Sequence, residues 1–336
     1  MTILVTGGAG YIGSHVVRML GEAGERILIV DDLSTGIADS VLYGDLVVGD
    51  IGDAGLLDQL FEQHDIEAVM HFAASTIVPE SVENPLKYYR NNAANTLTLL
   101  QACKQHGVGQ FVFSSTAAVY GIPENGIASE RSALRPINPY GLSKLHAEQM
   151  LVDLSRTGDI RHVTLRYFNV AGADPQYRIG QSTKKATLLI KVACEAALGQ
   201  RDGVDIFGTD YPTPDGTGVR DYIHVEDLAA AHLKALEYLR DGGNTVTLNC
   251  GYGHGYSVRE VLDEVRRASG VDFECRVAPR RAGDPPTLIA ECQQIRELFG
   301  WQPRLDRLET IVEHALAWER KLLDRSQVST DSGVDP

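Results

Sequence analysis

The 336-residue chain is long enough for about two domains, and its composition, 43% hydrophobic and 23% charged, is that of a globular protein with a sizeable core. A formal net charge of −14 argues against a nucleic acid or an anionic membrane surface as a partner. No apolar run is long enough to span a bilayer, and a strand pattern begins almost at Met1, so we expect no signal peptide.

The five cysteines are scattered, odd in number and without a C-x-x-C pair, which argues against a disulfide framework or a zinc site. The ten histidines form no H-E-x-x-H or similar cluster, so we predict no metal site. Such a cysteine pattern is typical of a reducing compartment, and the cytoplasm is the simplest expectation.

The chain opens with a strand, a glycine turn and a helix. The apolar run at residues 3–5 predicts a buried parallel strand, and Gly7, Gly10 and Gly13 follow it at G-x-x-G-x-x-G spacing. Apolar residues then recur at helical spacing. Because glycine has no Cβ, such a turn lets a pyrophosphate lie against backbone N–H groups at a helix N-terminus. This pattern predicts the first half of a dinucleotide-binding unit.

A second strand, predicted at residues 27–30, ends in Asp31, about twenty residues after the glycines, where a ribose-binding acid belongs. An ordinary strand–turn–helix with a surface aspartate is the alternative, but the order of strand, glycines, helix and acid favours a cofactor site. Asp31 and Asp32 together would repel a 2′-phosphate, so the sequence favours NAD over NADP.

Strand and helix patterns alternate through the first half of the chain. We predict further strands at 46–49, 68–72, 111–113 and 162–167, with helices at 56–61, 85–105 and 140–155. This alternation predicts an α/β fold, a Rossmann-like doubly wound parallel sheet. Ligands of such sheets collect beyond the carboxyl ends of the strands, where this chain has Asp50, Ala73-Ala74 and residues 114–116.

The alternation of strand and helix patterns becomes irregular after about residue 175, where loops become richer in Gly, Pro and Asp. We therefore predict an NAD-binding domain at 1–175 and a smaller C-terminal lobe, mainly substrate-binding, at 176–325. Residues of about 225–250 are expected to return to the first domain. The polar, aperiodic residues 326–336 predict a disordered tail.

Tyr140 and Lys144 stand at Y-x-x-x-K spacing on a predicted helix and so share a face. An ammonium beside a phenol favours the phenolate, so we expect the pKa of Tyr140 to fall toward neutrality. A chance pair on a solvated helix face is the alternative. The pair follows five predicted βα units, and Ser115-Thr116 lies at a strand end upstream, which favours a catalytic role in which Thr116 hydrogen-bonds the same reacting oxygen.

Four segments together resemble the extended short-chain dehydrogenase/reductase family: the glycine pattern at 7–13, S-S-T at 114–116, Y-G-L-S-K at 140–144 and R-Y-F-N at 166–169. Two later segments resemble the UDP-galactose (UDP-glucose) 4-epimerases of that family: I-F-G-T-D-Y-P-T-P-D-G-T-G-V-R-D-Y-I-H-V at 206–225 and A-P-R-R-A-G-D at 278–284. The resemblance extends to about residue 321.

This resemblance implies a bound NAD, a UDP-hexose substrate and a homodimer. It implies that Tyr140 removes the proton of the sugar 4-hydroxyl while C4 gives hydride to NAD, so that UDP-galactose and UDP-glucose interconvert through a transient 4-keto sugar and bound NADH. Lys144 would support the phenolate and hold the nicotinamide ribose. Thr116 would polarise the reacting oxygen.

The resemblance also implies two sets of binding residues. With Tyr140 and Lys144, the NAD set is Gly7, Gly10, Tyr11, Ile12, Gly13, Asp31, Asp32, Leu33, Ser34, Asp50, Ile51, Phe72, Ala73, Ala74, Asn91 and Phe168. With Thr116 and Tyr140, the UDP-sugar set is Asn169, Leu188, Phe207, Arg220, Arg281, Asp284 and Leu288. Arginines suit a diphosphate because they bind its oxygens bidentately.

Three positions depart from, or vary within, the family pattern. Thr76 lies where some members have a lysine near the cofactor, and Leu188 where many carry an Asn or His that touches the phosphates, which leaves backbone contact there. Leu288 lies where the family varies between a large tyrosine and small residues. Since small residues would admit N-acetylhexosamines and a large one would exclude them, leucine leaves the sugar open.

Related dehydratases and decarboxylases are the nearest rival enzymes. Dehydratases commonly carry Thr-Asp-Glu, and decarboxylases place a Glu at the third position, whereas this chain has Thr116-Ala117-Ala118. Alanine cannot shuttle protons, so the sequence favours epimerisation, which needs one tyrosine for both directions. Epimerisation of a UDP-uronate stays open. A non-catalytic NAD or sugar sensor would be expected to lose Tyr140 or Lys144.

Overall fold

The computed structural model describes residues 1–183, 186–281 and 283–331, with side chains described as far as residue 325. Its strands are β1 (Thr2–Thr6), β2 (Ile27–Asp31), β3 (Asp45–Val48), β4 (Ile66–His71), β5 (Gln110–Thr116), β6 (Ile127–Ala128), β7 (Arg161–Tyr167), β8 (Asn169–Ala171), β9 (Val204–Phe207), β10 (Val219–Arg220), β11 (Tyr222–His224), β12 (Val246–Cys250), β13 (Tyr256–Ser257), β14 (Cys275–Ala278) and β15 (Thr287–Ala290).

The main helices are α1 (Tyr11–Glu22), α2 (Ala54–Gln63), α3 (Val78–Glu83), α4 (Pro85–Tyr88), α5 (Asn95–Gln105), α6 (Pro139–Arg156), α7 (Leu189–Ala197), α8 (Val225–Arg240), α9 (Val258–Ser269), α10 (Gln293–Phe299) and α11 (Leu308–Asp331). A π-helical turn, η2 (Tyr89–Ala94), joins α4 to α5, and short 3₁₀ turns are η1 (Ala38–Ser40), η3 (Ala117–Val119) and η4 (Glu124–Gly126). None of the helices in the described ranges is both long and apolar enough to cross a membrane.

Seven parallel strands form the central sheet in the order β12-β7-β5-β4-β1-β2-β3, which confirms the predicted Rossmann-like doubly wound fold. The chain builds outward from β1 in one direction through β2 and β3, and then in the other through β4, β5, β7 and β12. The strand order therefore reverses between β1 and β4. A crevice at the carboxyl ends of the strands is expected at such a reversal.

Helices cover both faces of the sheet, so its central strands are buried on both sides. In β1, Ile3 and Val5 pack into the layer that contains α1 and α8, while Leu4 packs into the opposite layer with residues of α2, α5 and α6. This is the period-two alternation of a strand with apolar residues on both faces. Each such side chain stabilises the fold by about 1.5–3 kcal/mol relative to leaving it in water.

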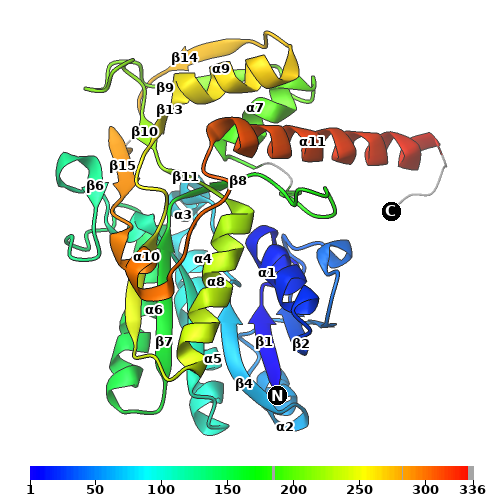
Figure 1. Cartoon of the computed structure of the whole chain (residues 1–336), viewed down its shortest axis with the longest axis vertical. Coiled ribbons are helices and arrows are strands. Elements are labelled where there is room, and N and C mark those ends of the chain that lie inside the picture. The colour runs from blue at the N-terminus through cyan, green and yellow to red at the C-terminus, as the bar shows by residue number, and fades with distance from the viewer. Residues whose placement is uncertain (184–185, 282, 332–336) are drawn as a thin grey trace.

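The smaller lobe lies beyond the carboxyl ends of the sheet. In Figure 1 the strand β1 rises from the N-terminus at the bottom, and α7, α9 and α11 lie above the sheet. These three helices pack on one another, beside the parallel pair β9–β14.

The two lobes exchange segments. The strand β12 pairs with β7 at one edge of the central sheet, and α8 packs on α1, so this later segment lies with the first half of the chain. In the other direction β6, from the first half, pairs with β15 in the small sheet β13-β10-β15-β6. The chain therefore crosses between the lobes more than once.

Two stretches differ from the expected elements. The helix expected over residues 85–105 is interrupted by η2. The side chains of Asn92 in η2 and of Asn95, the first residue of α5, hydrogen-bond partners outside the helix. A π-turn inserts an extra residue and so changes the face that these side chains occupy. At the other end of the chain the sequence predicts a disordered tail at 326–336, but α11 continues to Asp331, and residues 332–336 lie outside the described residues.

Candidate active site

A cleft of about 1630 Å³ opens at the carboxyl ends of the sheet strands, between the sheet and the smaller lobe. The predicted site residues that line it are Gly7, Gly10, Tyr11, Ile12, Gly13, Asp31, Asp32, Ser34, Asp50, Ile51, Phe72, Ala73, Ala74, Asn91, Thr116, Tyr140, Phe168, Asn169, Leu188, Phe207, Arg220, Arg281, Asp284 and Leu288. Leu33 and Lys144 do not line it.

The glycine turn between β1 and α1 brings two stretches of backbone too close for side chains. A Cβ on Gly7, whose φ is +72°, would lie 2.5 Å from the amide nitrogen of Ala73, and a Cβ on Gly13 would lie 2.2 Å from the carbonyl oxygen of Gly7. The N-cap of α1 is Gly10, which offers no side-chain acceptor to the first turn. The helix N-terminus therefore faces the cleft with free N–H donors, which is the arrangement that binds a phosphate anion.

We call the side of the cleft formed by the glycine turn and Asp31 the cofactor edge. Asp31, at the end of β2, connects two of its loops. Its carboxylate accepts hydrogen bonds from the amides of Ala9 and Leu33, each 2.9 Å long, and so ties the glycine turn to the next loop. Burial raises the pKa of Asp31, and the two amide donors oppose that rise. Leu33 has a φ of 56° and contributes this amide, not a surface of the cleft.

A set of polar residues around η2 extends this edge; Asn91 and Asp50 belong to the predicted NAD set, whereas Ser75 and Asn95 were not predicted from the sequence. Asn91 donates to the hydroxyl of Ser75 at 3.0 Å, and Asn95 donates to the Asp50 carboxylate at 2.8 Å. Ser75 and Asn95 also line the cleft. The signal that could have found Asn95 is the run Asn91-Asn92-x-x-Asn95, because asparagine is a poor former of helix interiors.

Thr116 lies at the end of β5 and Tyr140 near the start of α6, and both side chains reach the same part of the cleft. Thr116 closes β5, and its hydroxyl caps the next turn by accepting from the amide of Ala118 at 3.1 Å. Tyr140 lies in the first turn of α6, which Asn138 caps by accepting from the amide of Gly141 at 2.8 Å. Thr116 and Tyr140 are hydrogen-bonded to each other and both line the cleft.

The electrostatics of this pair correct one expectation. Burial raises the pKa of Tyr140, and the hydrogen bond with Thr116 only partly opposes this. Lys144 is buried one turn along, with its ammonium 4.2 Å from the centre of the Phe113 ring, and burial lowers its pKa to about 7 although Glu148 favours the charged form. The phenol thus does not have a pKa near neutrality here, because desolvation dominates and the ammonium lies over Phe113.

Two arginines of the smaller lobe, Arg220 and Arg281, line the side of the cleft opposite the cofactor edge, which we call the sugar-nucleotide edge. Arg220 on β10 forms an ion pair with Asp284 at 2.5 Å, and the Arg281 guanidinium lies 3.7 Å from the centre of the Phe207 ring. Such stacking stabilises an arginine by about 0.5–2 kcal/mol and leaves the guanidinium hydrogens free for oxygen ligands. This edge therefore offers fixed cations and an aromatic face, which suit a nucleoside diphosphate.

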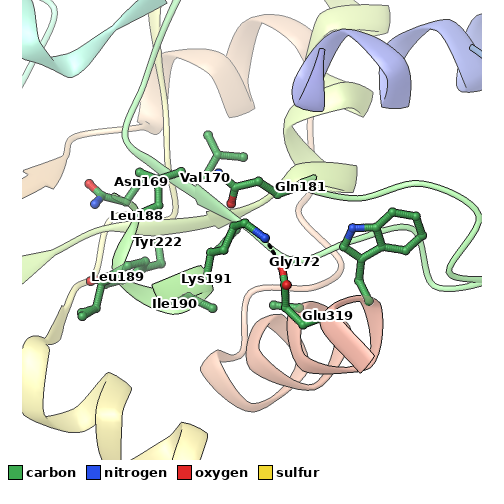
Figure 2. A pocket seen from close by; sticks show the side chains of 13 residues that line it. Asn169, Val170, Gly172, Gln181, Leu188, Leu189, Ile190, Lys191, Tyr222 and Glu319 are labelled. Atoms are coloured by element: carbon green, nitrogen blue, oxygen red, sulfur yellow. Dashed lines mark hydrogen bonds and ion pairs between the residues drawn. The ribbon is translucent and has the colours of Figure 1, made fainter. Parts of the chain in front are cut away.

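The remaining predicted residues lie between these edges. Asn169, Leu188 and Leu288 line the cleft, as do Thr76 and the pair Ala117-Ala118. A second cavity of about 20 Å³ adjoins this part of the cleft behind Asn169 and Leu188. Figure 2 shows that it contains a buried ion pair between Lys191 of α7 and Glu319 of α11, 2.5 Å apart.

The sequence model of the NAD dependent epimerase/dehydratase family matches residues 3–251. A UDP-glucose 4-epimerase of Azospirillum brasilense is 57% identical over 321 residues, which cover 95% of this chain and 92% of the relative. A UDP-glucose 4-epimerase from Brucella ovis, solved in complex with NAD, is 44% identical with a TM-score of 0.92, covering 94% of this chain and 97% of that one. The same enzyme from Bifidobacterium longum, solved in complex with NAD+ and UDP, is 36% identical with a TM-score of 0.91, covering 96% and 98%. This chain therefore belongs to the NAD dependent epimerase/dehydratase family.

Proposed function

We infer that this chain is an NAD-dependent UDP-glucose 4-epimerase, which interconverts UDP-galactose and UDP-glucose. The observation that carries this inference is the joint placement of three features in one cleft: a phosphate-binding glycine turn, the bonded pair Thr116–Tyr140, and the arginines Arg220 and Arg281. Relatives at high identity over nearly the full chain are UDP-glucose 4-epimerases.

The cofactor edge fits NAD by its own geometry. Gly7 and Gly13 leave no room for a Cβ, so the turn packs backbone against backbone and keeps side chains away from the N-terminus of α1. That uncapped N-terminus would supply donors for the pyrophosphate, and the Asp31 carboxylate is placed for ribose hydroxyls. NAD, when bound, supplies a reversible acceptor for the hydride of the sugar C4.

In this proposal Tyr140 is the one acid/base of the reaction. Its ionised phenolate oxygen takes the proton of the sugar 4-hydroxyl, and the resulting phenol later returns it, while Thr116 hydrogen-bonds the same sugar oxygen. The pKa of Tyr140 is raised by burial, so a cation close by is required to favour its ionised form. Lys144, one helical turn away on α6, is the residue assigned to that task.

The residues beside Thr116 decide what happens to the 4-keto sugar. Ala117 and Ala118 line the cleft and have no group that accepts or donates a proton. Elimination of water or loss of carbon dioxide needs such a group, whereas return of the proton from Tyr140 does not. Arg220 and Arg281 hold the diphosphate, so the ketone stays in place while the sugar turns over.

The test is incubation of the purified, NAD-loaded protein with UDP-galactose and no added reductant, followed by NMR of the sugar nucleotides. We expect an equilibrium mixture with UDP-glucose. Absence of UDP-glucose would contradict the proposed function, and a 4-keto-6-deoxy product would favour a dehydratase.

The homodimer is a proposal supported by an apolar surface. Val82 of α3, Leu86 of α4 and Leu97 of α5 are 64%, 76% and 45% exposed, and these neighbouring helices pack around α6. Exposed apolar side chains on neighbouring helices are typical of a contact surface, although Val82 also lines the cleft. Light scattering should give the mass of two chains, and Leu86→Glu should give one; a wild-type monomer would contradict the proposal.

A cytoplasmic location is also a proposal, supported by the chemistry of the cysteines. All five are free thiols, and four of them are buried. Thiols that persist without pairing are typical of a reducing compartment. Cell fractionation with an activity assay tests this, and activity confined to an oxidising compartment would overturn it.

A further inference from the structure

Beneath the cleft, Glu148 of α6 is the centre of a buried polar network. Its carboxylate accepts three hydrogen bonds from Arg166, at 3.0, 3.1 and 2.5 Å, and one from the hydroxyl of Ser115. Arg166 in turn donates to the hydroxyl of Tyr120 at 3.0 Å, and that hydroxyl donates to Asn249 at 2.7 Å. Glu148 and Arg166 are 4% and 5% exposed, so this pair is essentially out of water.

The network joins the two elements that carry the reacting groups, α6 and β5, to the neighbouring strand β7. Glu148 lies one turn after Lys144 on α6, so the two side chains share a helix face. Ser115 directly precedes Thr116 at the end of β5, and Arg166 stands near the end of β7, just before Asn169. A change at the Glu148 carboxylate therefore acts on the elements that carry Lys144 and Thr116.

The charges in this region balance when Lys144 is an ammonium and Tyr140 is ionised. Among the described side chains, Lys144 faces Glu148 along α6, the neutral imidazole of His71 from β4 and the ring of Phe113 from β5. Burial and the Lys144 ammonium both lower the pKa of His71. With Arg166 cationic, the sum over lysine, glutamate and arginine is one positive charge. An ionised Tyr140 brings that sum to zero.

Two further phenols face Tyr140 and stay neutral. The hydroxyl of Tyr88 is bonded to Ile77 and that of Tyr167 to Ser114, and burial raises the pKa of both. Neither therefore supplies a charge that would replace Glu148 in this balance.

We propose that Glu148 is a positioning residue of the reaction: held by Arg166 and Ser115, it keeps the Lys144 amine in the ammonium form that the phenolate of Tyr140 requires. This inference rests on the proposed function. Removing the carboxylate leaves the Lys144 ammonium buried beside an arginine, with no anion to compensate either cation, so the lysine sheds its proton more easily.

The experiment compares kcat and KM against pH for three variants of the NAD-loaded enzyme. Glu148→Gln should move the alkaline limb of the kcat profile to lower pH by about one unit and lower kcat at neutral pH by about tenfold, with little change in KM. An unshifted limb would overturn the proposal.

The double variant Glu148→Gln, Arg166→Met separates positioning from packing. It removes the unpaired arginine, so the melting temperature should recover, but Lys144 still lacks its anion and the limb should stay shifted. Recovery of both the melting temperature and the wild-type profile would show that Glu148 serves only to neutralise Arg166, which would overturn the proposal.

Glu319→Gln is the matched control. Glu319 is 3% exposed and paired with Lys191, 6% exposed, so this variant removes a similarly buried carboxylate outside the main cleft (Figure 2). Lys191 keeps a second partner, Glu195, at 3.3 Å. It should lower the melting temperature and leave the alkaline limb in place; a shifted limb here would contradict the specific role of Glu148.

A spectroscopic titration keeps the inference separate from the proposed function. The ionisation of Tyr140 is read as the tyrosinate absorbance that Tyr140→Phe lacks, with no substrate present. In Glu148→Gln, Tyr140 should ionise at higher pH because the lysine is neutral. If the wild type failed to epimerise UDP-galactose, this titration would still support the inference through a shift, or overturn it through none.

Discussion

The cofactor edge of the cleft is made largely of main chain, whereas the sugar-nucleotide edge is made of long side chains. At the first, Gly7 and Gly13 let backbone approach backbone, and amides face the cleft. At the second, Arg220 and Arg281 reach in from the smaller lobe. A site made of main chain can be predicted from a short sequence motif, because close backbone approach requires glycine. A site made of side chains cannot, because its residues come from segments that only the fold brings together.

The largest expected effect lies where the two edges meet. Tyr140→Phe removes one hydroxyl and should lower kcat by about 10²–10⁴-fold, the range typical of a lost acid/base group. Because neither edge loses a binding group, bound NAD and the melting temperature should stay near wild type. Steady-state kinetics and the absorbance of retained cofactor measure this, and a near-wild-type rate would remove Tyr140 from the mechanism.

The second-largest effect is expected at the cofactor edge. In Gly13→Ala the new Cβ meets the Gly7 carbonyl at 2.2 Å, so the turn must move, at a cost of about 1–3 kcal/mol. We expect lower NAD retention after gel filtration and a lower melting temperature. The control is Gly109→Ala, whose Cβ would lie no closer than 3.6 Å to a neighbour; equal losses in both variants would contradict a steric role of the turn.

At the sugar-nucleotide edge we expect a smaller effect, and we expect it in KM. Arg281→Ala removes a charged donor and should raise KM for UDP-galactose by about tenfold, which is the worth of one charge-assisted hydrogen bond. NAD content should not change. Arg267→Ala, an exposed arginine of α9 paired with Glu264, is the control. If Arg281→Ala lost NAD instead, the separation of the two edges would fail.

The smallest effect concerns sugar size. Leu288→Ala shortens a side chain that lines the cleft and should raise the relative rate with a UDP-N-acetylhexosamine, by up to about tenfold. Competition between acetylated and plain UDP-sugars measures the ratio. A ratio unchanged from wild type would show that Leu288 does not limit the space at the sugar.

The contrast between the edges also explains what the sequence could predict. The parallel sheet and the glycine turn follow from local periodicity and from the need to omit Cβ, and the relatives bear out the fold and the cofactor. The bond between Asp31 and Leu33 could not be foreseen, because it depends on a residue with φ of 56°. The π-turn η2 could not be foreseen either. The apolar residues of α5 resume a helical spacing directly after it, so the sequence pattern indicates one continuous helix.

The pKa expectation failed for a related reason. Spacing along a helix places Tyr140 and Lys144 on one face, but it does not state how deeply each is buried. In the fold both are withdrawn from water, and desolvation is the largest cause of the pKa change of each. The partners that offset it, such as Glu148 and Arg166, come from elements distant in the chain.

The exchange of strands between the lobes has a consequence for any shortened form of this protein. A fragment that stopped near residue 175 would lack β12, leaving the backbone donors and acceptors of β7 exposed along one side. It would also keep β6 without its partner β15. Such a fragment is expected to self-associate rather than bind cofactor, and the intact chain to melt in a single cooperative transition.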